Sequence, residues 1–256
     1  MPATTSTYLV TGANRGIGRG FVEKLLLKPG TTVIAAVRDL SKAAASLDEL
    51  PWGSGSRLIQ VKIDSSIDGD AANAVSVLQE EHEITAVDIV IANAGISHSG
   101  APVVENDPEA FRDHFNTNTI GPVTLLQAFL PLLKASETGQ PLFLVISTFV
   151  GSIGGQESLA NLPAVFSPYG ASKAALNWII RRLHYEEPWL TTWAAHPGVV
   201  LTDMGALFVS HVIDPATVGA VSVERSVSGI LDQIAEATRE EYGGKFKSYD
   251  GYTLQW

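Results

Sequence analysis

The sequence predicts an α/β protein built on a doubly wound parallel sheet, and three observations lead to this prediction. Short apolar runs typical of buried strands alternate with longer helical patterns along all 256 residues. A glycine-rich turn, residues 12–18, directly follows the first strand and opens the first helix. Polar side chains recur at the ends of later strands, where parallel sheets bind ligands. Because strand–helix–strand connections are right-handed, we expect helices on both faces of one sheet.

Composition narrows the class of protein. Hydrophobic residues make up 45% and charged residues 17% of the chain, as in ordered globular proteins. The net charge of −10 argues against nucleic acid or an anionic membrane as the main partner. The absence of cysteine excludes disulfides, thiolate metal sites and cysteine nucleophiles, and no metal site is expected. No signal peptide and no apolar run of ~18 residues are evident, so a cytoplasmic protein is expected.

The first strand, Thr7 to Val10, runs into a loop that has the properties of a phosphate site. Its glycines suit positive φ angles and close approach of the backbone to a ligand. The following helical pattern, through Leu26, aims its N-terminal N–H groups at the loop. The spacing Gly-x-x-x-Gly-x-Gly differs from the common dinucleotide fingerprint, and alone it also fits a tight strand–helix connection. The candidate cofactor residues here are Gly12, Asn14, Arg15, Gly16, Ile17 and Gly18.

The second strand, Thr31 to Val37, is continuously apolar, as expected for burial on both faces of a parallel sheet. Arg38 follows it, and Arg15 lies in the glycine loop. Two guanidinium groups at one ribose favour a 2′-phosphate, although both could be ordinary surface arginines. Asp39 is the alternative: as a ribose carboxylate it would reverse the cofactor preference.

Two more strand–helix pairs follow in the same alternation. Asp64 and Ser65 end a strand where they could meet the adenine, and a helix cap is the alternative role for Asp64. Asn93, Ala94 and Gly95 end the next strand and join the candidate cofactor residues. The expected elements are helix 41–50, strand 58–63, helix 70–83 and strand 87–92.

A long helical pattern begins at Asp107, with an acidic first turn and a proline at its first position. Asn118 lies within it, and a buried asparagine in a helix usually has a specific role. Pro122 frees an upstream carbonyl near Asn118 and is expected to kink the helix. The next strand, Leu142 to Ile146, ends in Ser147 and Thr148, whose hydroxyls would face the ligand crevice.

Tyr169 and Lys173 lie four residues apart at the start of a helix that is expected to reach Tyr185. This spacing places them on one helix face. The lysine would lower the phenol pKa towards the range of acid–base catalysis, although the same pair is common on solvated helices. The remaining expected elements are strand 190–195, a turn with Pro197, Gly198, Val200 and Thr202, a substrate-covering segment 203–222, helix 223–240 and a strand and tail 245–256.

These motifs together resemble the short-chain dehydrogenase/reductase family over essentially the whole chain. They are Thr11-Gly12-x-x-x-Gly16-x-Gly18, Asn93-Ala94-Gly95, a strand-end hydroxyl, Tyr169-x-x-x-Lys173 and Pro197-Gly198 followed by Thr202. Arg38 and the ending Tyr249-Asp250-Gly251-x-x-Leu254-x-Trp256 are similar to the carbonyl-reductase-like branch, which includes sniffer-type reductases and fungal norsolorinic acid ketoreductases. The resemblance implies a seven-stranded Rossmann fold with residues 1–256 forming a single domain.

The resemblance also implies roles for the site residues. Tyr169 would be the general acid, and Lys173 would lower its pKa and hold the nicotinamide ribose. Asn118 would hold a water that links Lys173 to solvent. The strand-end hydroxyl would bind the substrate oxygen, and Thr148 is favoured over Ser147, which sits one place earlier than the family pattern. The extra residues 156–167 would form a loop beside the substrate.

The leading hypothesis is NADPH-dependent reduction of a ketone or aldehyde to an alcohol. Segments 96–103, 149–166 and 204–212 are apolar and carry little positive charge, which favours a hydrophobic or aromatic carbonyl substrate, polyketides among them. The alternatives are an NAD(P)-dependent alcohol dehydrogenase working in the oxidative direction and a non-catalytic dinucleotide-binding sensor. His98, His196 and His211 are assigned no catalytic role. A homo-oligomer and a monomer both remain open, because members of the family include both.

Overall fold

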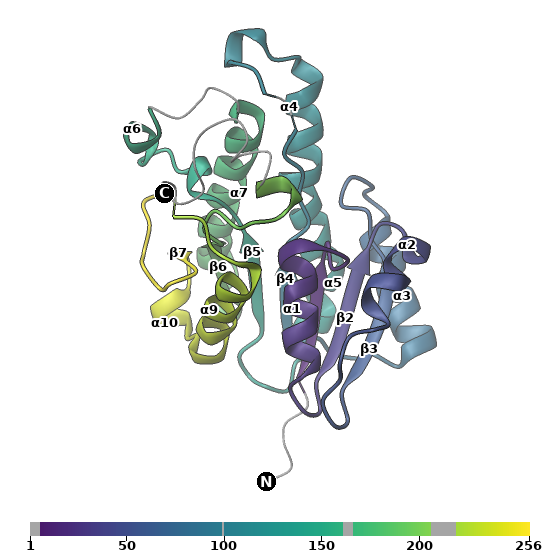
Figure 1. Cartoon of the computed structure of the whole chain (residues 1–256). Helices are drawn as coiled ribbons and strands as arrows, with labels where there is room; N and C mark the ends of the chain where they lie inside the picture. The colour runs from purple at the N-terminus through teal and green to yellow at the C-terminus, as the bar shows by residue number, and fades with distance from the viewer. Residues whose placement is uncertain (1–5, 99, 161–165, 206–218) are drawn as a thin grey trace.

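The computed structural model describes residues 6–98, 100–160, 166–205 and 219–256 (Figure 1). Seven strands form one sheet in the order β3-β2-β1-β4-β5-β6-β7, and every pairing is parallel. The predicted doubly wound seven-stranded sheet is therefore confirmed. The strands are β1 (Thr7–Thr11), β2 (Thr32–Val37), β3 (Arg57–Lys62), β4 (Ile89–Ala92), β5 (Leu142–Ile146), β6 (Thr191–His196) and β7 (Phe246–Ser248).

Helices cover both faces of the sheet, each over its own apolar cluster. On one face α1, α2 and α9 pack over a core that includes Phe21, Trp193 and Ile230. On the other face α3, α5 and α7 pack over a core that includes Phe129 and Phe143. Figure 1 shows α1 and α9 together in front of the sheet. The helices are α1 (Gly16–Leu26), α2 (Leu40–Leu47), α3 (Asp70–His82), α4 (Pro108–Phe115), α5 (Gly121–Lys134), α6 (Gln156–Leu159), α7 (Ser167–Glu186), α9 (Val223–Glu236) and α10 (Arg239–Tyr242).

The strand order reverses between β1 and β4. From β1 the chain winds outward to β2 and β3, then crosses back to β4 and continues the other way. At such a switch point the loops after the two strands diverge and leave a crevice at their carboxyl ends. The glycine loop follows β1 and Asn93 follows β4, so the two motifs meet at this crevice.

Two helices differ from the sequence expectation. The long helix from Asp107 is interrupted by a π-helical segment, Asn116–Ile120, between α4 and α5. Pro122 has no N–H to offer the Asn118 carbonyl four residues before it, so the ordinary ladder cannot continue there. The helix expected over 223–240 ends at Glu236, and α10 starts separately with the Thr238 hydroxyl accepting from the Glu241 N–H.

The segment expected to cover the substrate, residues 203–222, is described only at 203–205 and 219–222. His211 lies outside the described residues, as do positions 161–165 of the loop expected beside the substrate. The described part of that loop contains the short helix α6. Among the described residues, no helix is both long and apolar enough to cross a membrane.

Candidate active site

A cleft of about 1490 Å³ opens at the carboxyl ends of the strands. It extends from the glycine loop and the end of β2, past the ends of β4 and β5, to the start of α7. Of the residues predicted from the sequence, Gly18 and Asn118 do not line it. Those that line it are Gly12, Asn14, Arg15, Gly16, Ile17, Arg38, Asp64, Ser65, Asn93, Ala94, Gly95, Ser147, Thr148, Tyr169, Lys173, Pro197, Gly198, Val200 and Thr202.

The glycine loop is held against the end of β4. The Thr11 hydroxyl accepts hydrogen bonds from the backbone N–H groups of Asn93 and Ala94, at 3.0 and 2.9 Å. The Asn93 side chain donates to the Thr11 carbonyl at 2.9 Å. Gly18 is required for close packing, because a Cβ there would lie 2.1 Å from the Gly12 carbonyl oxygen. Its role is therefore to bring helix and loop together rather than to face the cleft.

The N-terminus of α1 is suited to a cofactor pyrophosphate. The helix begins at Gly16, and neither a capping side chain nor an acidic residue occupies its first turn. The free N–H groups and the positive end of the helix dipole therefore point towards the cleft. Gly16 has a φ of 55°, a conformation that glycine adopts without strain. Loop and helix together fit a dinucleotide.

Cationic side chains of the glycine loop, of the end of β2 and of α2 line the cleft. They are Arg15, Arg38 and Lys42. Arg15 pairs with Asp203 at 2.7 Å, and both side chains are largely exposed. The sequence analysis did not identify Lys42 as a cleft residue, because nothing in its pattern distinguishes it from an ordinary surface lysine of a short helix. Arg38, directly after β2, is the cation that the fold places where a ribose 2′-phosphate would lie.

Asp39 serves as the N-cap of α2. Its Oδ1 accepts from the Ser41 hydroxyl at 2.6 Å and the Lys42 backbone N–H at 3.2 Å, and its Oδ2 lies 3.3 Å from Lys42 Nζ. These hydrogen bonds, the one from Ser41 foremost, lower the pKa of Asp39 to about 2. A carboxylate committed to capping is a poor partner for a ribose hydroxyl, so the geometry favours the arginine alternative.

Asp64 is not a helix cap, since α3 starts at Asp70 after the cap residue Gly69. Its Oδ1 accepts from both the N–H and the hydroxyl of Ser66, at 2.9 and 2.7 Å. Burial raises the pKa of the Asp64 carboxyl, but the Ser66 hydrogen bonds and the charge of Arg38 outweigh it and leave the pKa lowered. Asp64 therefore remains ionised in the part of the cleft where an adenine is expected.

Tyr169 and Lys173 project from the first turns of α7 into the cleft, as their spacing predicts. Lys173 is buried, and its Nζ donates to the Ile146 carbonyl at the end of β5 at 2.7 Å. Burial lowers the pKa of Lys173 to about 8 and raises the pKa of Tyr169 to about 12. The expectation that the lysine lowers the phenol pKa is therefore wrong for the protein alone: loss of solvent around the phenol dominates.

The hydroxyls of Ser147 and Thr148, directly after β5, make different hydrogen bonds. Ser147 Oγ donates to Asn177 Oδ1 of α7 at 2.6 Å and is buried. Thr148 Oγ1 accepts from the Val150 N–H at 3.3 Å, and that bond does not use the Thr148 hydroxyl proton. A hydroxyl has one proton to donate, and the Ser147 proton is used in the hydrogen bond to Asn177. The geometry favours Thr148 as the hydroxyl for a substrate oxygen.

Asn118 is fully buried behind the cleft. Its Oδ1 accepts from the Ile96 N–H at 2.8 Å, and its Nδ2 donates to the Ile96 carbonyl at 2.9 Å and to Ser172 Oγ at 3.0 Å. The side chain thus anchors the chain after β4. The water that Asn118 is expected to hold stays a prediction. The sequence analysis expected segment 96–103 to meet the substrate, but it did not show that Asn118 holds the start of this segment.

The turn after β6 closes the cleft on the side of α9. The Pro197 carbonyl accepts from Ser226 Oγ at 2.7 Å, and Val200 forms a bridge with Val221. Thr202 lies against the glycine loop: a Cβ at Gly16 would be 3.2 Å from its methyl group. His196 takes no acidic role, because burial lowers its pKa to about 4 and its Nδ1 accepts from the Phe149 N–H.

The end of the cleft beyond Tyr169 is mainly apolar. No lysine or arginine lines this end among the residues that the structure describes. This agrees with the apolar segments expected from the sequence to meet the substrate. The lining residues here are Ile96, Ser97, Phe149, Val150, Leu159 and Phe166.

Known proteins resemble this chain along nearly its full length. The family model described as short chain dehydrogenase matches residues 6–211. Norsolorinic acid ketoreductases of Dothistroma septosporum and Aspergillus parasiticus are each 38% identical, and the matches cover 98% and 100% of this chain and 92% and 93% of theirs. The NADPH-bound carbonyl reductase from chicken fatty liver superposes with a TM-score of 0.82 at 30% identity, over 98% of this chain and 99% of its own. The chain therefore belongs to the short-chain dehydrogenase family.

Proposed function

We propose that this protein is an NADP(H)-dependent reductase that converts a ketone or an aldehyde into an alcohol, with Tyr169 as the general acid. One observation carries the proposal: Tyr169 and Lys173 line the same cleft as the glycine loop and Arg38. NADPH supplies a hydride, and the side chains of the protein manage the proton and the substrate oxygen.

The phosphorylated cofactor is supported from two sides. Arg15, Arg38 and Lys42 line the cleft, Arg38 directly after β2, and the Asp39 carboxylate is engaged in capping α2. The chicken carbonyl reductase, similar over nearly the whole chain, is described as NADPH-bound. A 2′-phosphate beside Arg38 would have a charge-assisted partner that a plain ribose hydroxyl would not use.

Tyr169 is suited to donate a proton. Its raised pKa, about 12, keeps the phenol protonated throughout the neutral range. When a carbonyl oxygen gains negative charge during reduction, the phenol delivers its proton to that oxygen. The Thr148 hydroxyl donates a hydrogen bond to the same oxygen and stabilises the developing charge.

Lys173 orients the cofactor ribose and supports the phenol. Its pKa of about 8 leaves it mostly charged at neutral pH, so it opposes the effect of burial as the phenolate forms. The relay of a proton from solvent through Asn118 stays a prediction.

The substrate is proposed to be a hydrophobic or aromatic carbonyl compound. The end of the cleft next to Tyr169 is lined by Ile96, Phe149, Phe166 and other apolar side chains. Two relatives at 38% identity are named for the reduction of norsolorinic acid, and by analogy polyketide ketones are candidates. That residues 1–256 form one cytoplasmic domain, in which 203–222 covers the substrate, also stays a prediction, and monomer and homo-oligomer both remain open.

The test is NADPH oxidation measured against a panel of aromatic and aliphatic ketones, quinones and aldehydes, together with the variant Tyr169→Phe. We expect wild-type turnover with aromatic ketones, a loss of at least ~100-fold in kcat for Tyr169→Phe and a Kd for NADPH within about threefold. Retained activity in Tyr169→Phe would remove the general-acid assignment. NADPH binding with no turnover of any substrate would favour the sensor, and turnover only with alcohols and oxidised cofactor would favour the dehydrogenase.

A further inference from the structure

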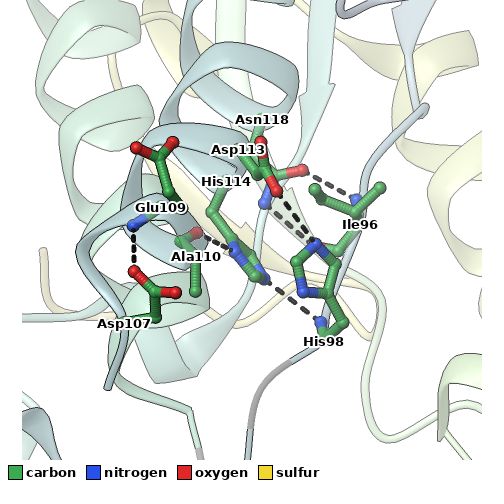
Figure 2. Close-up of polar contacts among 8 residues, drawn as sticks. All are labelled: Ile96, His98, Asp107, Glu109, Ala110, Asp113, His114 and Asn118. Atoms are coloured by element: carbon green, nitrogen blue, oxygen red, sulfur yellow. Dashed lines mark hydrogen bonds and ion pairs between the residues drawn. The ribbon is translucent and has the colours of Figure 1, made fainter. Parts of the chain in front are cut away.

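Two buried side chains hold the segment Ile96–His98 from the same stretch of helix. Asn118 binds both the N–H and the carbonyl of Ile96, at 2.8 and 2.9 Å. His114, four residues earlier, accepts a hydrogen bond from the His98 N–H on its Nε2 at 3.2 Å. Neither His114 nor Asn118 is exposed at all. Figure 2 shows the segment passing beside the helix, with both side chains reaching it.

This segment forms a wall of the cleft next to the reacting groups. Ile96 and Ser97 line the cleft directly after Gly95. A Cβ at Gly95 would lie 3.1 Å from Asn118 Oδ1 and 3.6 Å from Lys173 Nζ, which places the start of the segment beside the lysine. The His114 ring also meets the Tyr169 ring edge-on, with centroids 6.5 Å apart and an angle of 65° between the planes.

The hydrogen bonds of His114 define its protonation state. Nδ1 lies 2.6 Å from the Ala110 carbonyl oxygen, which can only accept, so Nδ1 carries the proton. Nε2 is then the unprotonated nitrogen, as the bond from the His98 N–H requires. With both ring nitrogens engaged, His114 cannot pass a proton to Tyr169. Its contribution must come through geometry.

We propose that His114 is a positioning residue, which fixes the Ile96–His98 wall and the edge of the Tyr169 ring so that a carbonyl substrate is held in register with the general acid. The inference rests on the proposed function, in which Tyr169 donates the proton. Because a misplacement of about 1 Å can reduce turnover roughly 100-fold, releasing this wall should reduce catalysis more than it reduces folding.

The same hydrogen bond makes the wall sensitive to acid. Protonating Nε2 would set an N–H against the His98 N–H and break the bond. Burial lowers the pKa of His114, as does the nearby His98, whereas the Ala110 carbonyl and Asp113 raise it, with a net decrease below 6.5. The groups that face the ring are His98 from the wall, Asp113 from α4 and Tyr169 from α7. The hydrogen bond from the His98 N–H to His114 should therefore be intact at neutral pH and lost when the pH falls below the lowered pKa of His114.

Two variants separate these effects. In His114→Gln the side-chain oxygen can accept from the His98 N–H but does not titrate, whereas His114→Leu removes the acceptor. For Leu we expect kcat/KM for the carbonyl substrate to fall by about tenfold or more, with the Kd for NADPH within about twofold. His114→Gln should keep kcat/KM within about threefold of wild type and should not show the decline of kcat/KM at low pH. Because this variant still contains His98, a decline caused by His98 would persist in it.

Hydrogen exchange gives a readout that is independent of turnover. The His98 amide should be protected in wild type and in His114→Gln but not in His114→Leu, while the Ile96 amide, held by Asn118, stays protected in all three. Wild type alone should lose His98 protection below the ordinary histidine pKa.

Three results would each overturn the proposal. They are equal His98 protection in wild type and His114→Leu, a decline of kcat/KM at low pH that persists in His114→Gln, and an unchanged kcat/KM in His114→Leu. If His114→Leu does not fold, the pH dependence of kcat/KM in wild type and His114→Gln still tests the proposal. A wild-type protein without reductase activity refutes the proposed function, whereas activity that is insensitive to His114 refutes only this inference.

Discussion

Ser147 and Asn177 form a buried hydrogen bond, from Oγ to Oδ1 at 2.6 Å, which links the end of β5 to the middle of α7. This bond ties the strand that ends at the active-site hydroxyls to the helix that carries Tyr169 and Lys173. It also separates two adjacent hydroxyls by function, because Ser147 donates inward while Thr148 retains a proton for the cleft.

Replacing each hydroxyl in turn tests this separation. Thr148→Val keeps the branched shape and removes the donor, so kcat should fall by roughly 100-fold, the usual effect of losing one donor to a developing oxyanion. Ser147→Ala should leave kcat within about threefold but lower the free energy of unfolding by about 1–3 kcal/mol, because it leaves the buried Asn177 oxygen without its donor. Steady-state kinetics and urea denaturation measure the two effects. A silent Thr148→Val would reassign the site to Ser147.

Cofactor preference should follow Arg38. A charge-assisted hydrogen bond to a phosphate contributes about 1.5–3 kcal/mol, so Arg38→Ala should weaken NADPH binding by roughly 10–100-fold. NADH binding should change by about twofold at most, since NADH lacks the 2′-phosphate. Titration of both cofactors by fluorescence measures the two affinities. Equal losses for the two would mean that Arg38 does not bind this phosphate.

The matched control is Asp39→Asn, at the neighbouring position. Asparagine caps a helix about as well as aspartate, so α2 should remain intact. If Asp39 is only a cap, the NADH affinity of this variant should stay within about twofold of wild type. A selective loss of NADH binding in this variant would instead show that the carboxylate binds the ribose.

The sheet could be predicted from the sequence because its strands are fully buried. Continuous apolar runs such as Leu142–Ile146 have few other interpretations, and the observed β5 has the same bounds. Helix ends were harder. Thr238, with Glu241 three residues later, has the spacing of a capping box and could have indicated the break before α10, but the apolar pattern on either side concealed it.

The site could be predicted only as far as its motifs reach. Tyr169, Lys173 and the glycine loop carry local spacing signals, and the structure places them in one cleft. His114 carries no such signal, because its partner, His98, is 16 residues away and binds through its backbone. The pKa of Tyr169 was expected to be lowered because charge was weighed without burial, and the extent of burial around a side chain is a property of the fold.

Lys173 is expected to lower the free energy of unfolding of the protein, although catalysis requires it. Its pKa is lowered from 10.5 to about 8 by burial, so between those values the unfolded chain binds more protons and wild-type stability rises with pH. Below about pH 8 the full penalty applies. At ~1.4 kcal/mol per pKa unit the penalty is about 3 kcal/mol, offset by about 1 kcal/mol for the hydrogen bond to the Ile146 carbonyl.

Lys173→Met should therefore abolish turnover yet raise the free energy of unfolding at pH 7 by about 2 kcal/mol. Methionine fills a similar volume and has no charge to desolvate. Urea denaturation at pH 7 and near pH 10 measures the difference, which should shrink at the higher pH as wild-type Lys173 becomes neutral in the folded state. Tyr169 titrates in both proteins, so its contribution cancels in the comparison. A variant that is less stable than wild type at pH 7 would mean that the bond from Lys173 to Ile146 outweighs the cost of burying the charge.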